Sequence, residues 1–518
     1  MANSKSTSKL ILILGDQLSL GSPCLKEINT AQDRVLMIEA AEESTTVWSS
    51  KQRIVVFLSA MRHFSEKLKT LGFPVEYLSL QNPLYAGDRI VERLESFIVS
   101  FHPAKVLMLE AGEWRLGQEI SALCKKHDLP LSVIEDSHFL CSHQDFQAFA
   151  KGKKRIIMEN FYRTMRRREN VLMNGEEPIG GEWNFDSENR KSFGSKGPQG
   201  IQDPIRFPPD RITQQVIEEV SQRFADHPGT LNHFGWPVTR EDALVALNDF
   251  IQHRLLTFGT HQDAMWTDQA FLSHALIGSS LNLKLLDPRE VIQAAEAAYQ
   301  KGSASIQAVE GFIRQILGWR EFIRGMYWLD MPAMKEANHF DHHHPLPAWF
   351  WTGNTQMRCM NEVITSTIAQ GYAHHIQRLM VLGLFGLVAE INPKEVSDWF
   401  LSVYVDAVEW VELPNVMGMA LFANGGRFTS KPYVASGAYI HRMSNYCKQC
   451  PYQPEQKVGE QACPITQLYW NFLDKHEQDF ASNPRTSLMI KNLQRIEPSV
   501  REQIKNEAEI ILNNLNAR

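Results

Sequence analysis

The chain has 518 residues, of which 43% are hydrophobic and 22% are charged, and its formal net charge is −6. This length fits two or three domains, and the composition is that of a globular protein with a large core. No run of about 18 uncharged apolar residues occurs, which excludes an ordinary membrane-spanning helix. The acidic balance also excludes a protein that is basic overall, so a nucleic-acid partner would need a local basic patch.

The N-terminus is a polar tail that enters a short apolar run ending in Gly-Asp. This pattern is typical of a tail before a first strand and not of a signal peptide. We therefore expect a cytoplasmic protein, in which an odd count of seven cysteines favours a metal site or free thiols over disulfides.

Five short apolar runs alternate with helical patterns in the first 140 residues. Such alternation predicts a doubly wound parallel sheet. The strands are expected at 10–16, 34–40, 74–80, 105–111 and 131–136, and the helices between them at 52–71, 87–100 and 114–127.

No GxGxxG segment follows the first predicted strand, so a dinucleotide fingerprint is absent. Ligands of such sheets still bind beyond the carboxyl ends of the strands. Asp16, Glu39 and Glu43 fall at these ends, although the residues alone favour solvated loop carboxylates.

Residues 141–230 have a different character. Eight Lys and Arg residues lie within 151–168, and a stretch rich in Gly, Ser, Asn and Pro follows them. From 231 onward the pattern is helical, so we divide the chain into an α/β domain (1–140), a connector (141–230) and an all-α domain (231–518). Helices are expected at 240–255, 287–300, 306–329, 359–389, 393–403 and 498–516.

Cysteine spacing gives the strongest local signal. Cys447 and Cys450 form a CxxC pair, and Cys463 follows twelve residues later, directly before a proline. A CxxC turn presents two sulfurs to one ion or cluster, and a Cys-Pro step is similar to the end of ferredoxin ligand runs. The spacing alone leaves zinc and an iron–sulfur cluster equally plausible, and Cys359 is the candidate for a fourth ligand because it lies in the helical half.

Four segments of the helical half resemble photolyases and cryptochromes, in the same order. They are FLSHALIGSSLN (271–282), GFIRQILGWREFIRGMYW (311–328), HHIQR (374–378) and VDAVEWVELPN (405–415). The opening ILGDQLS, the cysteine pattern and the pair His374-His375 narrow this resemblance to the iron–sulfur bacterial cryptochromes and photolyases. It covers nearly the whole chain.

The resemblance implies the two-part photolyase fold, with a Rossmann-like sheet domain and a helical FAD-binding domain, and three cofactors. FAD would be held around the Arg378–Asp406 ion pair, with Glu412 facing flavin N5. A [4Fe–4S] cluster would be held by Cys359, Cys447, Cys450 and Cys463. The antenna 6,7-dimethyl-8-ribityllumazine would contact Asp16, Glu43 and Met37, and further FAD contacts would come from Ser273, His274, Asn282 and Asn415.

The same resemblance implies a set of lesion and electron-transfer residues. His375, beside His374, would donate a proton during repair, and Trp319 would stack on the flipped bases. Trp399 and Trp351 would carry electrons to the flavin, with Phe400 where a Tyr is expected. Tyr433, Tyr439, Arg190 and Lys191 would lie near the lesion, and His342–His344 is interpreted as surface histidine.

We therefore expect a light-dependent lyase that binds UV-damaged duplex DNA, flips out a (6–4) photoproduct and repairs it as a monomer. The basic stretch would contact phosphates without reading sequence. A cryptochrome-type photoreceptor with the same cofactors is the alternative. An iron–sulfur nucleic-acid-binding protein without flavin would explain the cysteines but not the segments around Arg378 and Asp406.

Overall fold

A computed structural model describes residues 8–85 and 87–515, and its N-terminal part is a five-stranded parallel sheet in the order β3-β2-β1-β4-β5. The central strand β1 pairs with β2 on one side and with β4 on the other, with Ile11 opposite both Val35 and Leu107. The strands are β1 (Lys9–Ile13), β2 (Arg34–Ile38), β3 (Val75–Leu78), β4 (Lys105–Leu109) and β5 (Leu131–Ile134).

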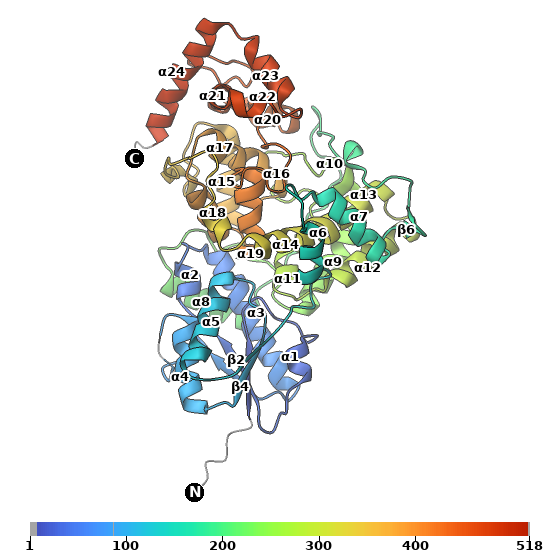
Figure 1. Cartoon of the computed structure of the whole chain (residues 1–518), viewed down its shortest axis with the longest axis vertical. Coiled ribbons are helices and arrows are strands. Elements are labelled where there is room, and N and C mark those ends of the chain that lie inside the picture. The colour runs from blue at the N-terminus through green and yellow to red at the C-terminus, as the bar shows by residue number, and fades with distance from the viewer. Residues whose placement is uncertain (1–7, 86, 516–518) are drawn as a thin grey trace.

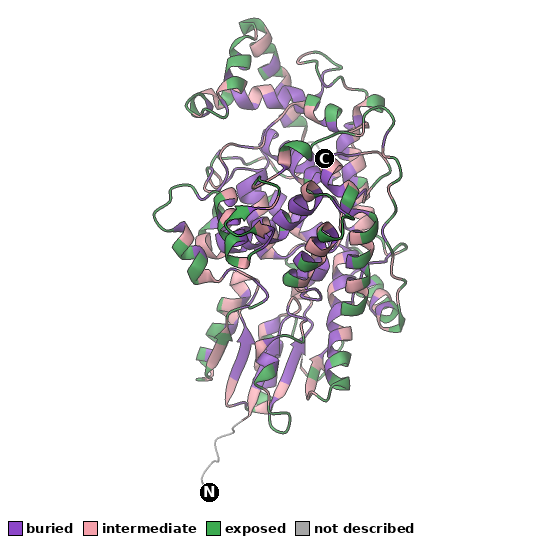
Figure 2. Cartoon of the chain, turned by 90° about the vertical axis from the view of Figure 1, so that its right-hand side faces the viewer, coloured by how far each residue is buried: buried purple, intermediate pink, exposed green. Residues whose placement is uncertain are grey.

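Alternate residues of each strand pack on opposite faces of this sheet. Ile11 and Val35 pack toward α3 (Lys51–Thr70), whereas Leu10 and Leu36 belong to a separate core with α4 (Ile90–Phe101) and α5 (Trp114–Lys126). Both faces of a parallel sheet are covered in this way, which is why its strands appear in the sequence as nearly continuous apolar runs. Figure 2 shows the strands as largely buried, with exposed residues on the outer turns of the helices. Two short helices, α1 (Pro23–Lys26) and α2 (Glu42–Thr45), complete this part.

The connector between the sheet and the helical part contains regular structure. Its elements are α6 (His143–Ala150), α7 (Met158–Glu169), the hairpin β6 (Met173–Asn174) and β7 (Glu177–Pro178), a 3₁₀ turn (Asp186–Glu188) and α8 (Arg211–Arg223). α8 returns to pack on α3, where Arg62 pairs with Glu219. α6 and α7 pack instead on the helical part, and a Cβ at Gly325 would lie 2.2 Å from Phe146, so only a glycine permits this close approach.

The helical part forms the middle and the far end of the molecule (Figure 1). Its core is continuous with the α3 face of the sheet, so the two parts share one buried cluster. The helices are α9 (Arg240–His253), α10 (Leu255–His261), α11 (Gly278–Asn282), α12 (Pro288–Gln300), α13 (Ile306–Ile313), α14 (Glu321–Asp330), α15 (Arg358–Gln370), α16 (His375–Gln377), α17 (Leu384–Val388), α18 (Pro393–Val403), α19 (Glu409–Leu413), α20 (Gly437–Met443), α21 (Pro464–Lys475), α22 (Glu477–Ala481), α23 (Ser487–Gln494) and α24 (Pro498–Leu515).

The predicted fold class is confirmed, and each predicted strand exists with slightly shorter bounds. The predicted helix over 359–389 is instead interrupted after α15 by residues 371–374, where Gly371 takes a left-handed conformation (φ 66°). The predicted polar tail lies outside the described residues. The interpretation of His342–His344 as surface histidine is wrong for His342, which is only 3% exposed and stacks on Phe340. In the described part of the chain, no helix combines the length and apolarity that crossing a membrane requires.

Candidate active site and cofactor cavities

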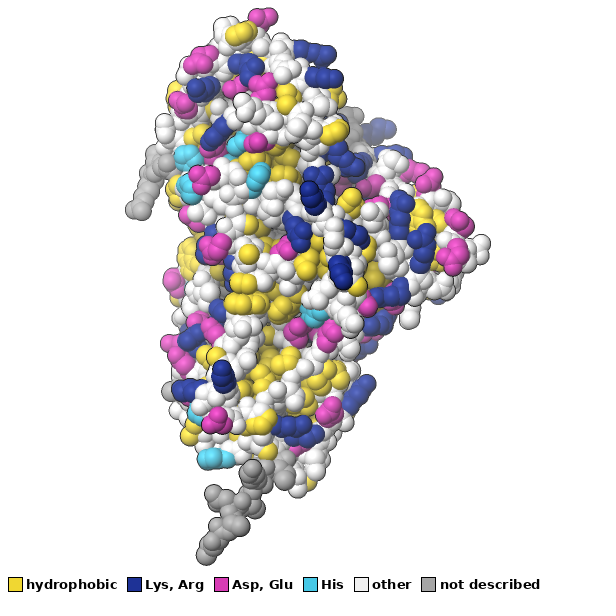
Figure 3. All heavy atoms as spheres, in the orientation of Figure 1, with side chains coloured by type: hydrophobic (Ala, Val, Ile, Leu, Met, Phe, Trp, Pro, Cys, Tyr) yellow, Lys and Arg dark blue, Asp and Glu magenta, His cyan; other side chains and the backbone are white. Residues whose placement is uncertain are grey.

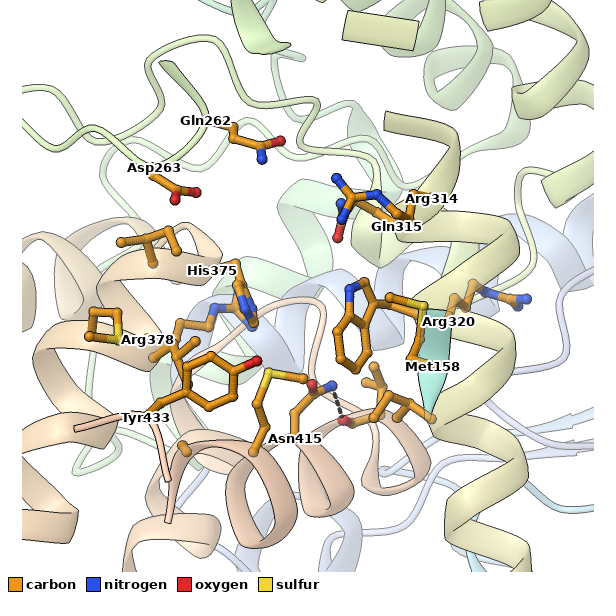
Figure 4. A pocket seen from close by; sticks show the side chains of 18 of the residues that line it. Met158, Gln262, Asp263, Arg314, Gln315, Arg320, His375, Arg378, Asn415 and Tyr433 are labelled. Carbon is orange, nitrogen blue, oxygen red and sulfur yellow. Dashed lines mark hydrogen bonds between the residues drawn. The ribbon is translucent and has the colours of Figure 1, made fainter. Parts of the chain in front are cut away.

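A deep cavity of about 1120 Å³ opens in the helical part. This exceeds the roughly 300–1,000 Å³ of ordinary ligand pockets, so there is room for a large ligand together with part of a second one. In Figure 4, His375, Arg378 and Tyr433 lie on one side of the cavity, Arg314 and Gln315 lie across from them, and Asn415 lies at its base. Gln262 and Asp263 lie at the rim.

Three π-helical segments surround this cavity: Arg314–Arg320, Arg378–Gly383 and Pro414–Ala420. Each of them contributes several lining residues, among them Trp319 and Asn415. π-helical turns are rare and occur mostly at functional sites, because the wider turn redirects side chains at a cost to the regular hydrogen bonding. Their convergence marks this cavity as the functional centre of the molecule.

The loop before α11 is held in an unusual backbone conformation. Leu272 and Leu276 in this loop, and Lys284 just after α11, have positive φ angles (46°, 58° and 64°), a conformation that non-glycine residues rarely adopt. Beside it, the buried hydroxyls of Ser279 and Ser280 have no hydrogen-bond partner within the described residues. Unsatisfied buried donors of this kind suit a ligand rich in acceptor oxygens.

Arg378 is the electrostatic centre of the cavity. Its guanidinium contacts both Asp406 oxygens (Nη2–Oδ1 3.0 Å, Nη2–Oδ2 2.9 Å) and donates from Nη1 to Glu412 Oε1 at 2.9 Å. It also lies over the ring of Tyr404, with 3.7 Å from Cζ to the ring centroid. Burial raises the pKa of Glu412 to about 7, against the lowering effect of Arg378. Glu412 therefore sits at the balance between its neutral and charged forms at neutral pH.

The predicted lesion histidines lie in two different environments. His375 lines the cavity, whereas His374 is 1% exposed, stacks on His274 at 4.4 Å between ring centroids, and is not among the described lining residues. Both ring nitrogens of His374 lack a partner within the described chain. Burial, and next the charge of Arg378, lowers the pKa of His375 to about 4, so His375 is neutral at pH 7 in the protein alone.

Most of the other predicted lesion and FAD residues meet in the same cavity. Its lining includes the predicted residues His274, Asn282, Asn415, Trp319, Tyr433, Tyr439 and Arg190. Two predicted residues, Ser273 and Lys191, are not among the described lining residues. Ser273 is buried with its hydroxyl against Thr257 (2.8 Å), and Lys191 is exposed, with its backbone N–H donated to Thr260.

The four predicted cluster ligands surround one small enclosed cavity. Cys359, Cys447, Cys450 and Cys463 all line it, together with apolar neighbours such as Ile440. A Cβ at Gly437 would lie 2.9 Å from Cys463 Sγ, so the backbone comes very close to this sulfur. Burial raises the pKa of Cys359 and Cys463, and raises that of Cys447 to about 12. Four thiolates could share this space only around a bound cation.

A second cavity of about 280 Å³ lies where the sheet domain meets the helical part. Asp16 and Glu43, the predicted antenna contacts, line it, and burial raises the pKa of both carboxyls, that of Glu43 to about 7. Met37 is not among the described lining residues. It is fully buried on the α3 side of β2, because successive side chains of a strand point to opposite faces.

The predicted electron-transfer residues are neighbours beside the large cavity. Trp399 is 1% exposed and contacts Phe400, with 5.6 Å between ring centroids, and Phe400 lines the cavity. Trp351 lies 6.3 Å from Trp399 on the other side. Neither tryptophan is among the described lining residues, so Phe400 is the one of these three rings that borders the cavity.

The predicted basic stretch is only partly available to a ligand. Arg166 is fully buried and donates to the carbonyl oxygens of Val171, Leu172 and Trp183. Lys151, Lys153, Lys154, Arg155 and Arg167 remain exposed. In Figure 3, dark blue side chains gather over the region of α6 and α7, which supplies Met158 and Glu159 to the edge of the cavity.

Several cavity residues had no signal in the sequence. Arg314 pairs with Glu310 and Asp186 and thereby ties the connector to the cavity wall. Burial raises the pKa of Asp263, at the rim, to about 6. These positions come from segments far apart in the chain, and only the assembled fold brings them together.

Comparison with known proteins agrees with this geometry. A solved bacterial class III photolyase from Agrobacterium tumefaciens matches the fold with a TM-score of 0.58 at 15% identity, over all of this chain and 99% of that one. The family model "Deoxyribodipyrimidine photo-lyase-related protein" matches residues 11–236. A protein named (6-4) photolyase from Agrobacterium fabrum (strain C58 / ATCC 33970) is 44% identical over 510 residues, which cover 98% of this chain and all of that relative.

A sheet domain joined to a helical domain with one large central cavity is thus the photolyase and cryptochrome fold. The chain belongs to the deoxyribodipyrimidine photolyase-related proteins, the family of this bacterial (6-4) photolyase. An uncharacterised protein of Acanthamoeba polyphaga mimivirus is 32% identical over 116 residues, which are 22% of this chain.

Proposed function

We propose that this protein repairs (6–4) pyrimidine photoproducts in DNA with the energy of light. The observation that carries this proposal is the convergence of His375, Trp319 and the Arg378–Asp406 pair on one cavity of about 1120 Å³. That cavity has room for a flavin and for a flipped nucleotide. The 44% identity to a (6-4) photolyase over the full length of that relative supports the same reaction.

The residues of the cavity fit FAD. Arg378 offers a hydrogen-bonded charge beside Asp406, and Asn282 donates to the backbone oxygen of Asp406 at 2.7 Å. The hydroxyls of Ser279 and Ser280, which have no partner within the described residues, lie on α11 between the lining residues Gly278 and Leu281. A Cβ at Gly278 would lie 3.0 Å from the Asp406 carboxylate, so the backbone can approach a ligand closely there. When bound, fully reduced FAD supplies the photoexcited electron that opens the lesion. Glu412, neutral or charged near pH 7, holds or releases a proton at its carboxyl oxygen.

His375 provides the proton in this proposal. Its imidazole lines the cavity, and Arg378 lies close enough to lower its pKa. The phosphates of bound DNA bring negative charge, which favours the protonated imidazole. His374 has no place in the cavity lining and instead supports His274 by stacking, so we assign it a positioning role.

The exposed cations before and on α7 would hold the DNA backbone, since phosphate contacts need no sequence signal. Arg190, held by Asp186 at 2.8 Å, reaches the cavity from the connector. Trp319 and Tyr433 would receive the flipped lesion between their rings. The partner that we propose is UV-damaged duplex DNA.

The four cysteines fit a [4Fe–4S] cluster better than a single zinc ion. Within the described chain, no three His, Cys, Asp or Glu side chains converge closely enough to hold one metal ion, although four sulfurs line one cavity. Four cysteine thiolates on one cavity are the usual ligand set of such a cluster. The cluster would tie α15 to the loop before α21 and thereby fix the C-terminal helices.

The cavity at the domain junction fits a flat polar chromophore, and we assign it to the lumazine antenna. Asp16 and Glu43 offer polar contacts at its edge, and Glu412 lines both this cavity and the large one. The two ligands would therefore lie on either side of one residue, which favours energy transfer between them.

Replacement of His375 by Ala tests the assignment of the proton donor. We expect the variant to keep its flavin and to lose repair, because the one other described imidazole that lines the cavity is that of half-buried His274, which stacks on His374. The exposed His343 replaced by Ala is the matched control and should repair like the unaltered protein. Unchanged repair by His375→Ala would overturn the assignment.

A further inference from the structure

A chain of three tryptophan rings runs from beside the large cavity to the protein surface. Trp399 is 1% exposed, Trp351 is half-buried, and Trp48 is 42% exposed. The ring centroids are 6.3 Å apart between Trp399 and Trp351 and 4.8 Å apart between Trp351 and Trp48. Within the described residues, each of these two steps is a direct contact between the two rings.

The backbone fixes Trp48 against the helix that carries Trp399. Trp48 belongs to the sheet domain, in the loop between α2 and α3. The next residues bond to the end of α18: Ser50 N donates to Ser402 O at 2.8 Å, and Ser50 Oγ donates to Val403 O at 3.2 Å. On the other side, His227 donates from Nδ1 to the carbonyl oxygen of Ser49 (2.8 Å) and packs its ring against Trp48. These contacts hold the exposed side chain of Trp48 in a fixed position beside Trp351.

Other aromatic routes from Trp399 end on rings that are harder to oxidise. Phe350 lies between Trp399 (5.3 Å) and Trp349 (4.8 Å), and a phenylalanine ring resists oxidation. Tyr404 lies 6.1 Å from Trp399 but carries the Arg378 guanidinium at 3.7 Å from its ring centroid. A cation over the ring disfavours removal of an electron, and burial raises the pKa of the Tyr404 hydroxyl, which disfavours loss of its proton.

We propose that Trp48 is the terminal electron relay, through which external reductants refill the path that reduces the flavin by light. This inference rests on the proposed function, because it requires that FAD occupies the large cavity. Trp399 gives one electron to the photoexcited flavin, Trp351 refills Trp399, and Trp48 refills Trp351. The Trp48 radical cation then loses its indole proton to water, since its ring is open to solvent.

The reductant is a small thiol or another one-electron donor in solution. One thiol returns one electron and one proton to the Trp48 radical and becomes a thiyl radical. Two such rounds deliver two electrons inward, and the two thiyl radicals combine to a disulfide. The sheet domain thereby contributes a residue to electron supply, in addition to its antenna cavity.

The test compares Trp48→Phe with Trp349→Phe in the full-length holoprotein. Trp349 is a matched control, because it is also partly buried near Trp399 but is reached only through Phe350. Under continuous blue light with dithiothreitol, we expect several-fold slower bleaching of the oxidised flavin in Trp48→Phe and an unchanged rate in Trp349→Phe. Equal rates for the unaltered protein and Trp48→Phe would overturn the proposal, as would equal slowing in both variants.

Transient absorption gives a second readout that does not depend on enzymatic activity. Added thiol should shorten the lifetime of the tryptophan radical in the unaltered protein and in Trp349→Phe but not in Trp48→Phe, where the radical stops on half-buried Trp351. The same thiol effect in Trp48→Phe would contradict the relay. Chemically reduced protein without light-dependent repair activity would refute the proposed function instead, so the two failures are distinguishable. Thermal unfolding and flavin content of each variant verify that it folds.

Discussion

Arg378 holds Asp406 by two contacts, 3.0 Å and 2.9 Å from one guanidinium nitrogen to the two carboxylate oxygens, at the wall of the large cavity. The side chains are 15% and 20% exposed, so the pair is largely withdrawn from water. We expect Asp406→Asn to lower the free energy of unfolding by about 3 kcal/mol, because the buried cation loses one of its two carboxylate partners. The same change should strongly reduce FAD content. Urea unfolding and the flavin-to-protein absorbance ratio measure the two effects.

An exposed ion pair provides the control for Asp406. Lys67 and Glu241 contact each other at 3.0 Å with side chains that are 49% and 69% exposed. Lys67→Gln should change the free energy of unfolding by less than about 1 kcal/mol and leave flavin content unchanged. Full flavin occupancy in Asp406→Asn would show that the pair does not support the cofactor.

Repair should depend on pH through His375. Its pKa in the protein alone is lowered to about 4, and a donor must carry its proton, so the donor form is present below the pKa and lost as the pH rises through it. Bound DNA phosphates raise this pKa. We therefore expect the repair rate at saturating DNA to fall as the pH rises. Histidine-selective NMR should show a higher His375 pKa in the complex with lesion DNA than in the free protein.

The variant His375→Gln tests whether the pH dependence of repair comes from the titration of His375. His375→Gln keeps a polar side chain that cannot carry the proton, so any repair that remains should lose this pH dependence. A pKa of His375 that is the same with and without lesion DNA would contradict the proposed donor.

The cysteine cavity predicts iron in the purified protein. Cys447→Ser should lose iron, acid-labile sulfide and the broad visible shoulder, and should unfold more easily because the loop before α21 is no longer tied to α15. Cys124, buried in α5 far along the chain from these four, is the control, and Cys124→Ser should retain iron. One equivalent of zinc in place of iron, or unchanged iron in Cys447→Ser, would contradict the cluster.

We expect the smaller cavity to bind a second chromophore, through residues other than those that bind FAD. A Cβ at Gly112 would lie 2.2 Å from Asp16 Oδ2, so Gly112→Ala should displace Asp16 and weaken antenna binding. FAD content should stay the same, because the large cavity is not altered. Glu76→Gln, on the exposed side of β3, is the control. Chromatography of the released chromophores measures both occupancies, and a full antenna content in Gly112→Ala would refute this placement.

The sequence predicted what local patterns encode. Buried parallel strands such as β1 appear as apolar runs because both faces are covered, and Cys447, Cys450 and Cys463 lie together because they are close in the chain. The pairing of Arg378 with Asp406 came only from the resemblance to photolyases, and the spacing of the cysteines made Cys359 no more than a candidate for the fourth ligand. No local pattern indicated the rim residue Asp263, because loops meet there through tertiary packing.

Three of the predictions that differed from the structure have clear physical reasons. Met37 is fully buried on the α3 side of β2 and is not among the described residues that line the antenna cavity. Arg166 was counted with the DNA-binding cations, but its guanidinium is fully buried against backbone oxygens. His342 packs into an aromatic cluster, which a run of three histidines in a loop does not reveal.

The central claim is tested most directly by repair of a defined oligonucleotide duplex that contains one (6–4) photoproduct. The fully reduced protein should restore the undamaged bases under blue light, should do nothing in darkness, and should leave a matched cyclobutane-dimer duplex unrepaired. His343→Ala should behave like the unaltered protein, and His375→Ala should be inactive with its flavin bound. No light-dependent repair of the (6–4) duplex by flavin-loaded, fully reduced protein would contradict the account and favour a photoreceptor.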